Sequence, residues 1–389
     1  MFVRLQAPII FMVAAKCFQK SSKKTHFSAS QSENLYFRHK CAPWPGLLGA
    51  NGQTLQFLNL NSSMFLLQND GSHVQTTTGP QTHALLEQNW VHSSPKYGLR
   101  FDGQPPKIGY NGIMRSNVVW KCGGMMVKGD NHTVIHNLVF EKRNEKQGDH
   151  QGNKCALCVL KYVRENPVPI NNNSVVMYNA ADVANGGVHS KKLYSLAGGV
   201  VKYNVISNVS EQLVDPENFD FRPLSNSTYL QHNAGPYSYD PEMTHYWIPG
   251  RQLYKASTPV PPDNSVKVNP SRRDILMWLN GYEASVHLVY FGTNKERVRS
   301  ATPNSPEYRG SVGNGGNVFH LKINLDPKTE YFWRVDAEVS PSGVYLGDVW
   351  SFTTADGDVT LSRGAIAWNS CLIVTLQVTM VTFLILIMQ

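Results

Sequence analysis

Short apolar stretches, each built around an asparagine, recur through the first half of the chain. Leu86–His92, Met114–Trp120 and Val134–Phe140 share one order: an apolar residue, two variable positions, an asparagine, an apolar residue, a valine and a ring-bearing residue. Ile170–Val176 and Val201–Ser207 fit the same order with smaller final residues. A repeat of this length, made of runs too short for helix pairs, is typical of a solenoid of short strands.

The repeating asparagines lie 28, 20, 36 and 31 residues apart, at Asn89, Asn117, Asn137, Asn173 and Asn204. Stacked coils bring parallel strands to within about 4.8 Å of one another. An inward asparagine at the same corner of each coil can then hydrogen-bond its neighbours above and below. We therefore expect these five residues to form a ladder. The rings of His92, Trp120 and Phe140 would stack along the same axis.

A second match fixes the register of two coils. Gly98–Gly103 and Gly124–Gly129 agree position for position, with apolar residues at alternate places. Side chains alternate between the two faces of a strand, so these apolar residues would face the core. The match places Asp102 on the outer surface, directly beside Lys128 of the next coil, as an opposite-charge pair.

The stretches "NWVHSSPKYGLRFDG", "SNVVWKCGGMMVKGDNHTVIHNLVFE" and "LVDPENFDFRPLSNSTY" resemble right-handed parallel β-helix proteins of the pectate-lyase-like superfamily. The resemblance covers roughly Trp44–Arg251 and implies a β-helix over residues 41–254. Polysaccharide lyases of this group use a basic residue to remove a proton beside a uronate carboxyl and a cation to stabilise the resulting charge. By that resemblance Lys128 would be the base, and Arg100 or Arg115 would neutralise the carboxylate, near Asp102. The alternative is that these residues are ordinary outer positions of the coils.

The composition changes after the solenoid. Residues 255–270 are rich in Pro, Ser, Thr and Asn, as in a linker. Alternating apolar runs follow, and "LDPKTEYFWRVDA" resembles the signature of fibronectin type III domains. This resemblance covers residues 258–355 and implies a β-sandwich, in which the Tyr331 hydroxyl bonds back to the chain and Trp278 and Trp333 lie between the sheets. The predicted fold class is all-β, a solenoid followed by a sandwich.

Histidine and cysteine spacing raises the question of metal binding. His132 and His136 lie four apart but lack the glutamate of a helical HExxH motif, so we expect no metal there. Cys155 and Cys158 have CxxC spacing without the second pair that a zinc site needs. In an exported chain we expect a disulfide between Cys122 and one of this pair. No cofactor is expected, except Ca²⁺ if the chain is a lyase.

Both ends of the chain indicate export. Residues 1–40 include a short apolar stretch that resembles a signal peptide, and residues 356–389 combine a polar spacer with an apolar tail. The small residues 355–357 before this tail favour a GPI anchor, with a transmembrane helix or a buried core segment as alternatives. Sequons for N-glycosylation occur at Asn61, Asn131, Asn172, Asn208 and Asn226.

The net charge of +8 is spread along a chain in which only 16% of the residues are charged. No nucleic-acid motif accompanies it, so we expect no nucleic-acid partner. The leading hypothesis is an extracellular, membrane-anchored protein whose β-helix contacts an acidic polysaccharide or cell-surface glycan, as a lyase-like enzyme or as a binder. The alternative is a non-catalytic adhesion or structural protein that uses the solenoid and sandwich as a protein-binding spacer.

Overall fold

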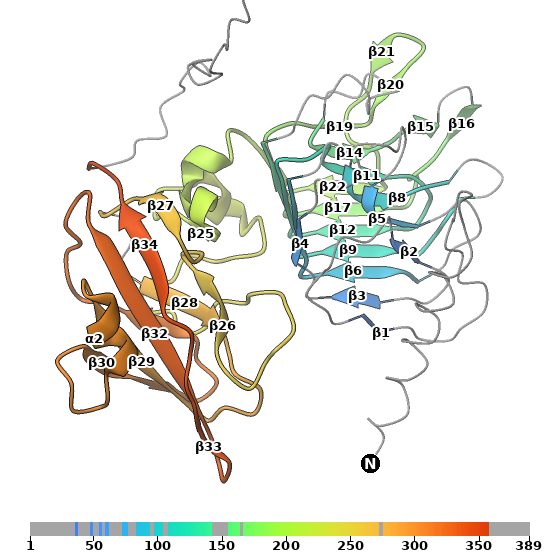
Figure 1. Cartoon of the computed structure of the whole chain (residues 1–389). Coiled ribbons are helices and arrows are strands. Elements are labelled where there is room, and N and C mark those ends of the chain that lie inside the picture. The colour runs from blue at the N-terminus through green and yellow to red at the C-terminus, as the bar shows by residue number, and fades with distance from the viewer. Residues whose placement is uncertain are drawn as a thin grey trace, which may run out of the picture. The chain divides into compact units, whose positions relative to one another are not determined.

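The computed structural model describes residues 83–357 apart from 94–96, 104–107, 142–154, 164–165 and 272–274, and the backbone of short strands at 36–37, 47–49, 54–56, 59–61 and 72–76. Within residues 36–206 the strands stack into three parallel sheets, as the prediction of a solenoid requires (Figure 1). From residue 54 to residue 185, each coil contributes one strand to each sheet.

Sheet A contains, in stacking order, β1 (Tyr36–Phe37), β3 (Thr54–Gln56), β6 (Leu85–Glu87), β9 (Ile113–Arg115), β12 (Thr133–Ile135), β17 (Val175–Met177) and β22 (Val200–Lys202). Sheet C contains β4 (Asn59–Asn61), β7 (Trp90–His92), β10 (Val118–Trp120), β13 (Leu138–Phe140), β18 (Ala180–Ala181) and β23 (Val205–Ile206). Sheet B contains β2 (Leu47–Gly49), β5 (Ser72–Thr76), β8 (Tyr97–Phe101), β11 (Met125–Val127), β14 (Leu157–Val159) and β19 (Ala184–Asn185). Two antiparallel hairpins, β15 (Tyr162–Val163) with β16 (Asn166–Pro169) and β20 (Val188–His189) with β21 (Lys192–Leu193), interrupt the coils.

The corner between sheets A and C is built from a left-handed residue followed by an asparagine. The left-handed residues have φ between 51° and 57° and are Gln88, Ser116, His136, Tyr178 and Tyr203. Each directs the chain into the next sheet and brings the following asparagine inward. Few residue types prefer this conformation, and adopting it costs conformational free energy. The contacts between equivalent corners of successive coils must offset this cost.

The asparagines at this corner form a continuous ladder of Asn89, Asn117, Asn137, Asn179 and Asn204. Asn137 shows the pattern: its Oδ1 accepts from both the backbone N–H (3.1 Å) and the Nδ2 (2.9 Å) of Asn117. Its own Nδ2 donates to Asn179 Oδ1 and to Met114 O, each at 2.9 Å. All the polar capacity of the buried amide is therefore used.

The prediction for Asn173 was wrong, because the ladder residue of that coil is Asn179. Asn173 is exposed in the turn before β17. The stretch "INNNSVV" imitates the repeat because it ends in two valines. The stacked stretch is Val176–Ala181, whose strand after the asparagine is only Ala180–Ala181.

Alternating side chains separate an interior from an outer layer. One cluster inside the coils includes Leu99, Val119, Met125, Val134 and Val176. On the outer face of sheet C, His92, Trp120 and Phe140 stack as predicted, with centroid separations of 4.1 and 6.3 Å.

The outer face of sheet C is covered by the chain that follows the last coil. This segment contains η2 (Ser210–Gln212), β24 (Leu213–Asp215), η3 (Pro216–Asn218), β25 (Asp220–Pro223) and η4 (Thr228–His232). Trp90 Nε1 donates to the Tyr237 hydroxyl at 2.9 Å, and this hydroxyl donates to Trp247 O at 3.1 Å. Burying a large apolar side chain contributes roughly 1.5–3 kcal/mol of free energy, so burial of these rings stabilises the contact between the segment and the solenoid.

Residues 255–357 form two further sheets. One contains β26 (Ser257–Val260), β28 (Ile275–Leu279) and β31 (Val318–His320). The other contains β27 (Ser265–Val268), β34 (Trp350–Thr354), β32 (Glu330–Val339), β29 (Val286–Gly292) and β30 (Tyr308–Gly313), with β33 (Gly343–Tyr345) also on β32. The short helix α2 (Lys295–Ser300) follows β29.

The core of this region includes Trp278 and Trp333, as predicted. The predicted bond of Tyr331 is also present, since its hydroxyl accepts from Asp326 N–H at 2.9 Å. The expectation of a linker over 255–270 was wrong for half of its length, because β26 and β27 lie within it. Proline and serine are tolerated there because both strands lie at sheet edges.

Several predictions concern residues outside the described part. These are nearly all of the leader 1–40, the tail 358–389 with its anchor, and the side chain of Asn61. In the described residues, no helix has the length and apolar character needed to cross a bilayer.

Candidate functional site

Three of the four residues assigned a lyase role lie together. Lys128 Nζ lies 2.8 Å from Asp102 Oδ1, and Arg100 Nη2 lies 2.7 Å from Asp102 Oδ2. The cross-coil neighbours predicted from the glycine alignment are therefore correct, because β8 and β11 pair with Leu99 opposite Met125. The cluster is not a solvated surface, however, since the Lys128 side chain is only 3% exposed.

Arg115 does not join this cluster. It lies on β9 of sheet A, where its exposed side chain pairs with Glu87 of the preceding coil. A catalytic base must reach the proton that it removes. The Lys128 ammonium is instead buried and bonded to a carboxylate, as in a structural ion cluster. Of the two expected cations, Arg100 binds the same carboxylate and Arg115 lies on another sheet.

His132 and His136 have separate structural roles. His132 is buried, its Nδ1 accepting from Gly112 N–H at 2.9 Å and its Nε2 lying 3.1 Å from Lys128 O. Burial lowers the pKa of His132 to about 4. His136 instead stacks on Tyr178, with ring centroids 5.0 Å apart. In the described residues, no group of three or more His, Cys, Asp or Glu side chains could hold a metal ion.

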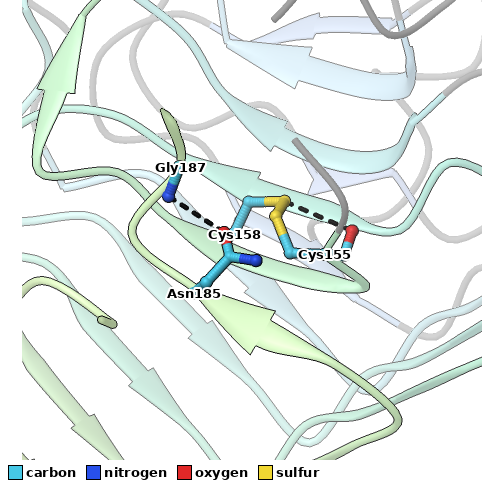
Figure 2. Close-up of a disulfide and its surroundings, with 4 residues drawn as sticks. All are labelled: Cys155, Cys158, Asn185 and Gly187. Atoms are coloured by element: carbon cyan, nitrogen blue, oxygen red, sulfur yellow. Dashed lines mark hydrogen bonds between the residues drawn. A yellow bond between two sulfur atoms is a disulfide. The ribbon is translucent and has the colours of Figure 1, made fainter. Parts of the chain in front are cut away.

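The expected disulfide between Cys122 and the CxxC pair was wrong, because Cys155 and Cys158 are bonded to each other (Figure 2). The reason is the alternation of side chains in sheet B. Cys155 and Cys158 belong to an outer apolar cluster with Met126, whereas Cys122 is buried in the interior cluster. Figure 2 also shows the turn beside the disulfide, where Asn185 Oδ1 accepts from Gly187 N–H at 2.9 Å.

The sequons in the described part are accessible. Their asparagines are all exposed: Asn131, Asn172, Asn208 and Asn226. Glycosylation at these positions would therefore not require a buried side chain to leave the core.

A basic and aromatic patch, which we did not predict from the sequence, lies where the two hairpins meet. We define it as Lys161, Tyr162, His189, Lys191, Lys192 and Tyr194. The Tyr162 ring stacks on His189 at 4.8 Å and meets Tyr194 edge-on at 5.1 Å. Lys192 Nζ lies 5.4 Å from the centre of the Tyr194 ring. The patch thus joins two segments that are remote in the chain.

The backbone holds this patch in a defined geometry. Lys161 N–H donates to Gly186 O at 2.9 Å, which ties the first hairpin to the second. A side chain on Gly186 would come within 2.2 Å of Ser195 O, so only glycine fits. Ser190 and Lys191 form the two-residue turn between β20 and β21 with φ of 48° and 65°. A two-residue turn with positive φ at both positions matches the twist of a hairpin and fixes Lys191 at its tip.

The described residues around the patch carry mostly positive charge. The described residues between 155 and 207 include four lysines and a single carboxylate, Asp182. The Asp182 carboxylate accepts from the backbone N–H groups of Glu141 and Val209, and burial raises its pKa. Lys191 and Lys192 are exposed, so they are accessible to an anion in solution. The signal in the sequence was "VHSKKLY" (Val188–Tyr194), but nothing in the sequence placed Tyr162 beside it.

No family model matches the chain, and no curated protein matches it. Among solved structures it is similar to the alpha-L-rhamnosidase from Dictyoglumus thermophilum, at 19% identity over 27% of this chain and 13% of that chain, with a TM-score of 0.23. Such a low score supports no inference about fold or activity.

Proposed function

We propose that the chain is an extracellular, membrane-anchored protein that binds acidic glycans without cleaving them. The observation that carries the proposal is the basic and aromatic patch on the hairpins of the solenoid. Exposed ammonium groups attract carboxylate or sulfate groups and raise the rate of encounter. Amphipathic tyrosine rings offer apolar surface beside a polar hydroxyl, which suits a sugar ring with an apolar face and a polar rim.

Binding alone is favoured over lyase chemistry because of where the candidate catalytic groups lie. Lys128 is buried against Asp102, and Arg115 is paired with Glu87 on another sheet. The resemblance to pectate-lyase-like proteins then concerns architecture, since one fold supports many functions. Should the chain still act as a lyase, Ca²⁺ would be its expected cofactor.

The remaining parts of the chain fit display at a cell surface. We propose that residues 258–355 are a fibronectin type III-like module that spaces the solenoid from its anchor. The bond between Asp326 N–H and the Tyr331 hydroxyl supports this assignment. The apolar tail would hold the chain in the membrane, through a GPI anchor or as a helix, and the exposed sequons would carry glycans.

A panel of immobilised polysaccharides tests the proposal. The full chain in detergent should bind uronate-containing and sulfated polymers and should not bind neutral polymers of the same length. The same mixtures should develop no ultraviolet absorbance from unsaturated sugar ends, whereas appearance of that absorbance would establish a lyase. Equal binding to acidic and neutral polymers would contradict the role given to the lysines.

A protein-binding spacer is the second candidate. It is favoured by Val188 and Leu193, which lie opposite each other on the second hairpin and are both exposed. Exposed apolar side chains at such a position favour contact with a partner protein. A partner that is still captured after enzymatic removal of all its glycans would favour this candidate.

A further inference from the structure

Strand β33 (Gly343–Tyr345) is an edge strand of unusual composition. It pairs with β32 alone, and its hairpin projects beyond the neighbouring strands of its sheet (Figure 1). The stretch 339–347 carries no charged residue. Val344 and Leu346 within it are 51% and 68% exposed. An exposed apolar edge is a template for pairing with another strand.

The other edges of the two C-terminal sheets are protected in the usual ways. Lys267 lies on β27 and Arg309 on β30, so both of these edges carry a charge. β26 contains Pro259, which has no N–H to offer a new strand. The segment before Tyr246 lies along β31, where Asn317 N–H donates to Thr244 O at 3.0 Å. Among the described strands of residues 255–357, β33 is the edge without a charge, a proline or a cover.

A cluster of exposed rings extends the apolar surface from this edge. Tyr345 stacks on Tyr254 with centroids 5.2 Å apart, and Tyr254 meets Tyr282 edge-on at 5.9 Å. Tyr254 and Tyr282 are both exposed. Tyrosine is enriched at protein interfaces, because one end of the ring is apolar and the other forms hydrogen bonds.

We infer that β33 pairs antiparallel with β33 of a second copy of this chain, across a two-fold axis. The backbone N–H and C=O groups of an exposed edge can pair with another strand. A charged partner strand would find no counter-charge within 339–347. The same uncharged stretch of a second copy places no like charges opposite each other and matches apolar to apolar. This inference does not depend on glycan binding.

A cysteine at the symmetry axis tests the pairing directly. In antiparallel pairing centred on Val344, the two Cα atoms would lie about 4.5–5.5 Å apart, within the reach of a disulfide. The full chain with Val344→Cys, in detergent under mild oxidation, should give a covalent dimer on a non-reducing gel. The matched control is Val266→Cys, because Val266 is an exposed valine (63%) on another edge strand, β27. It should give no more dimer than the unmodified chain.

Charge variants provide a second measurement that does not depend on cross-linking. Val344→Lys should raise the dissociation constant of the dimer by about tenfold or more, since like charges then face each other. Mixing equal amounts of Val344→Lys and Val344→Glu chains should restore association. Equal cross-linking of the two cysteine variants, or no recovery on mixing the charged ones, would overturn the inference.

Discussion

Lys128 Nζ and Asp102 Oδ1 lie 2.8 Å apart, although 26 residues separate them in the chain. They meet because each follows a strand of sheet B, and these two strands lie in register in successive coils. Arg100 donates to the other oxygen of the same carboxylate. One buried anion thus holds two buried cations, and its loss would leave both of them without that charge.

Replacing Asp102 should therefore destabilise the solenoid strongly. Asp102→Asn keeps the shape but removes the charge, and breaking a buried ion pair typically costs 3–5 kcal/mol. Urea titration followed by circular dichroism gives the free energy of unfolding. The control is Glu87→Gln, whose partner Arg115 is exposed, and which should cost about 1 kcal/mol or less. Similar losses in the two variants would argue against a buried cluster.

The asparagine ladder leads to a prediction about the register of the coils. Asn137→Ala removes the acceptor of Asn117 N–H and leaves this buried group unsatisfied. Such a group costs about 1–3 kcal/mol, and the lost bonds of the side-chain amide add to it. Asn173→Ala should change the free energy of unfolding by no more than about 0.5 kcal/mol, because Asn173 is exposed. A larger loss for Asn173→Ala would restore the register that the sequence predicted.

The sequence predicted the repeat because stacking imposes the same demands on every coil. Asn89, Asn117 and Asn137 recur with apolar neighbours that are easy to align, and the register of Asp102 and Lys128 follows from matched glycines. Asn179 was missed because Ala180 and Ala181 are too small to resemble the other strands. The patch was missed for a different reason: the contact of Tyr162 with His189 depends on two insertions, and insertions do not follow the repeat.

Acid should weaken the fold through His132. Burial lowers the pKa of His132 from 6.5 to about 4. Between pH 6.5 and pH 4 the unfolded chain therefore binds a proton at this histidine, and the folded chain does not. Stability present above pH 6.5 is therefore lost as the pH falls toward 4, by about 3 kcal/mol for the whole shift.

Burial also lowers the pKa of His287 to about 4, so it contributes a loss of the same sign. The free energy of unfolding, measured at pH 7.5, 6 and 5, should therefore fall as the pH falls, and this slope measures the loss. His132→Gln and His287→Gln should each remove about half of it. An unchanged slope in both variants would mean that other groups cause the loss.

Glycosylation tests the proposed extracellular location. Asn131, Asn172, Asn208 and Asn226 are exposed, so folding places no steric barrier to glycans there. The chain produced in a eukaryotic cell should shift to lower mass after treatment with peptide-N-glycosidase. Mass spectrometry should then find aspartate at these positions. A chain that carries no glycan would be at odds with passage through the secretory pathway.

The most direct test of glycan binding is a titration of the full chain in detergent with a sulfated or uronate oligosaccharide. The variant Lys191→Glu/Lys192→Glu reverses two exposed charges of the patch. The control Lys295→Glu/Arg297→Glu changes the net charge equally, at exposed positions on α2. We predict a dissociation constant at least about tenfold higher for the patch variant, equivalent to about 1.4 kcal/mol, and no change for the control. Equal affinities of the two variants would contradict the proposal that the patch binds the glycan.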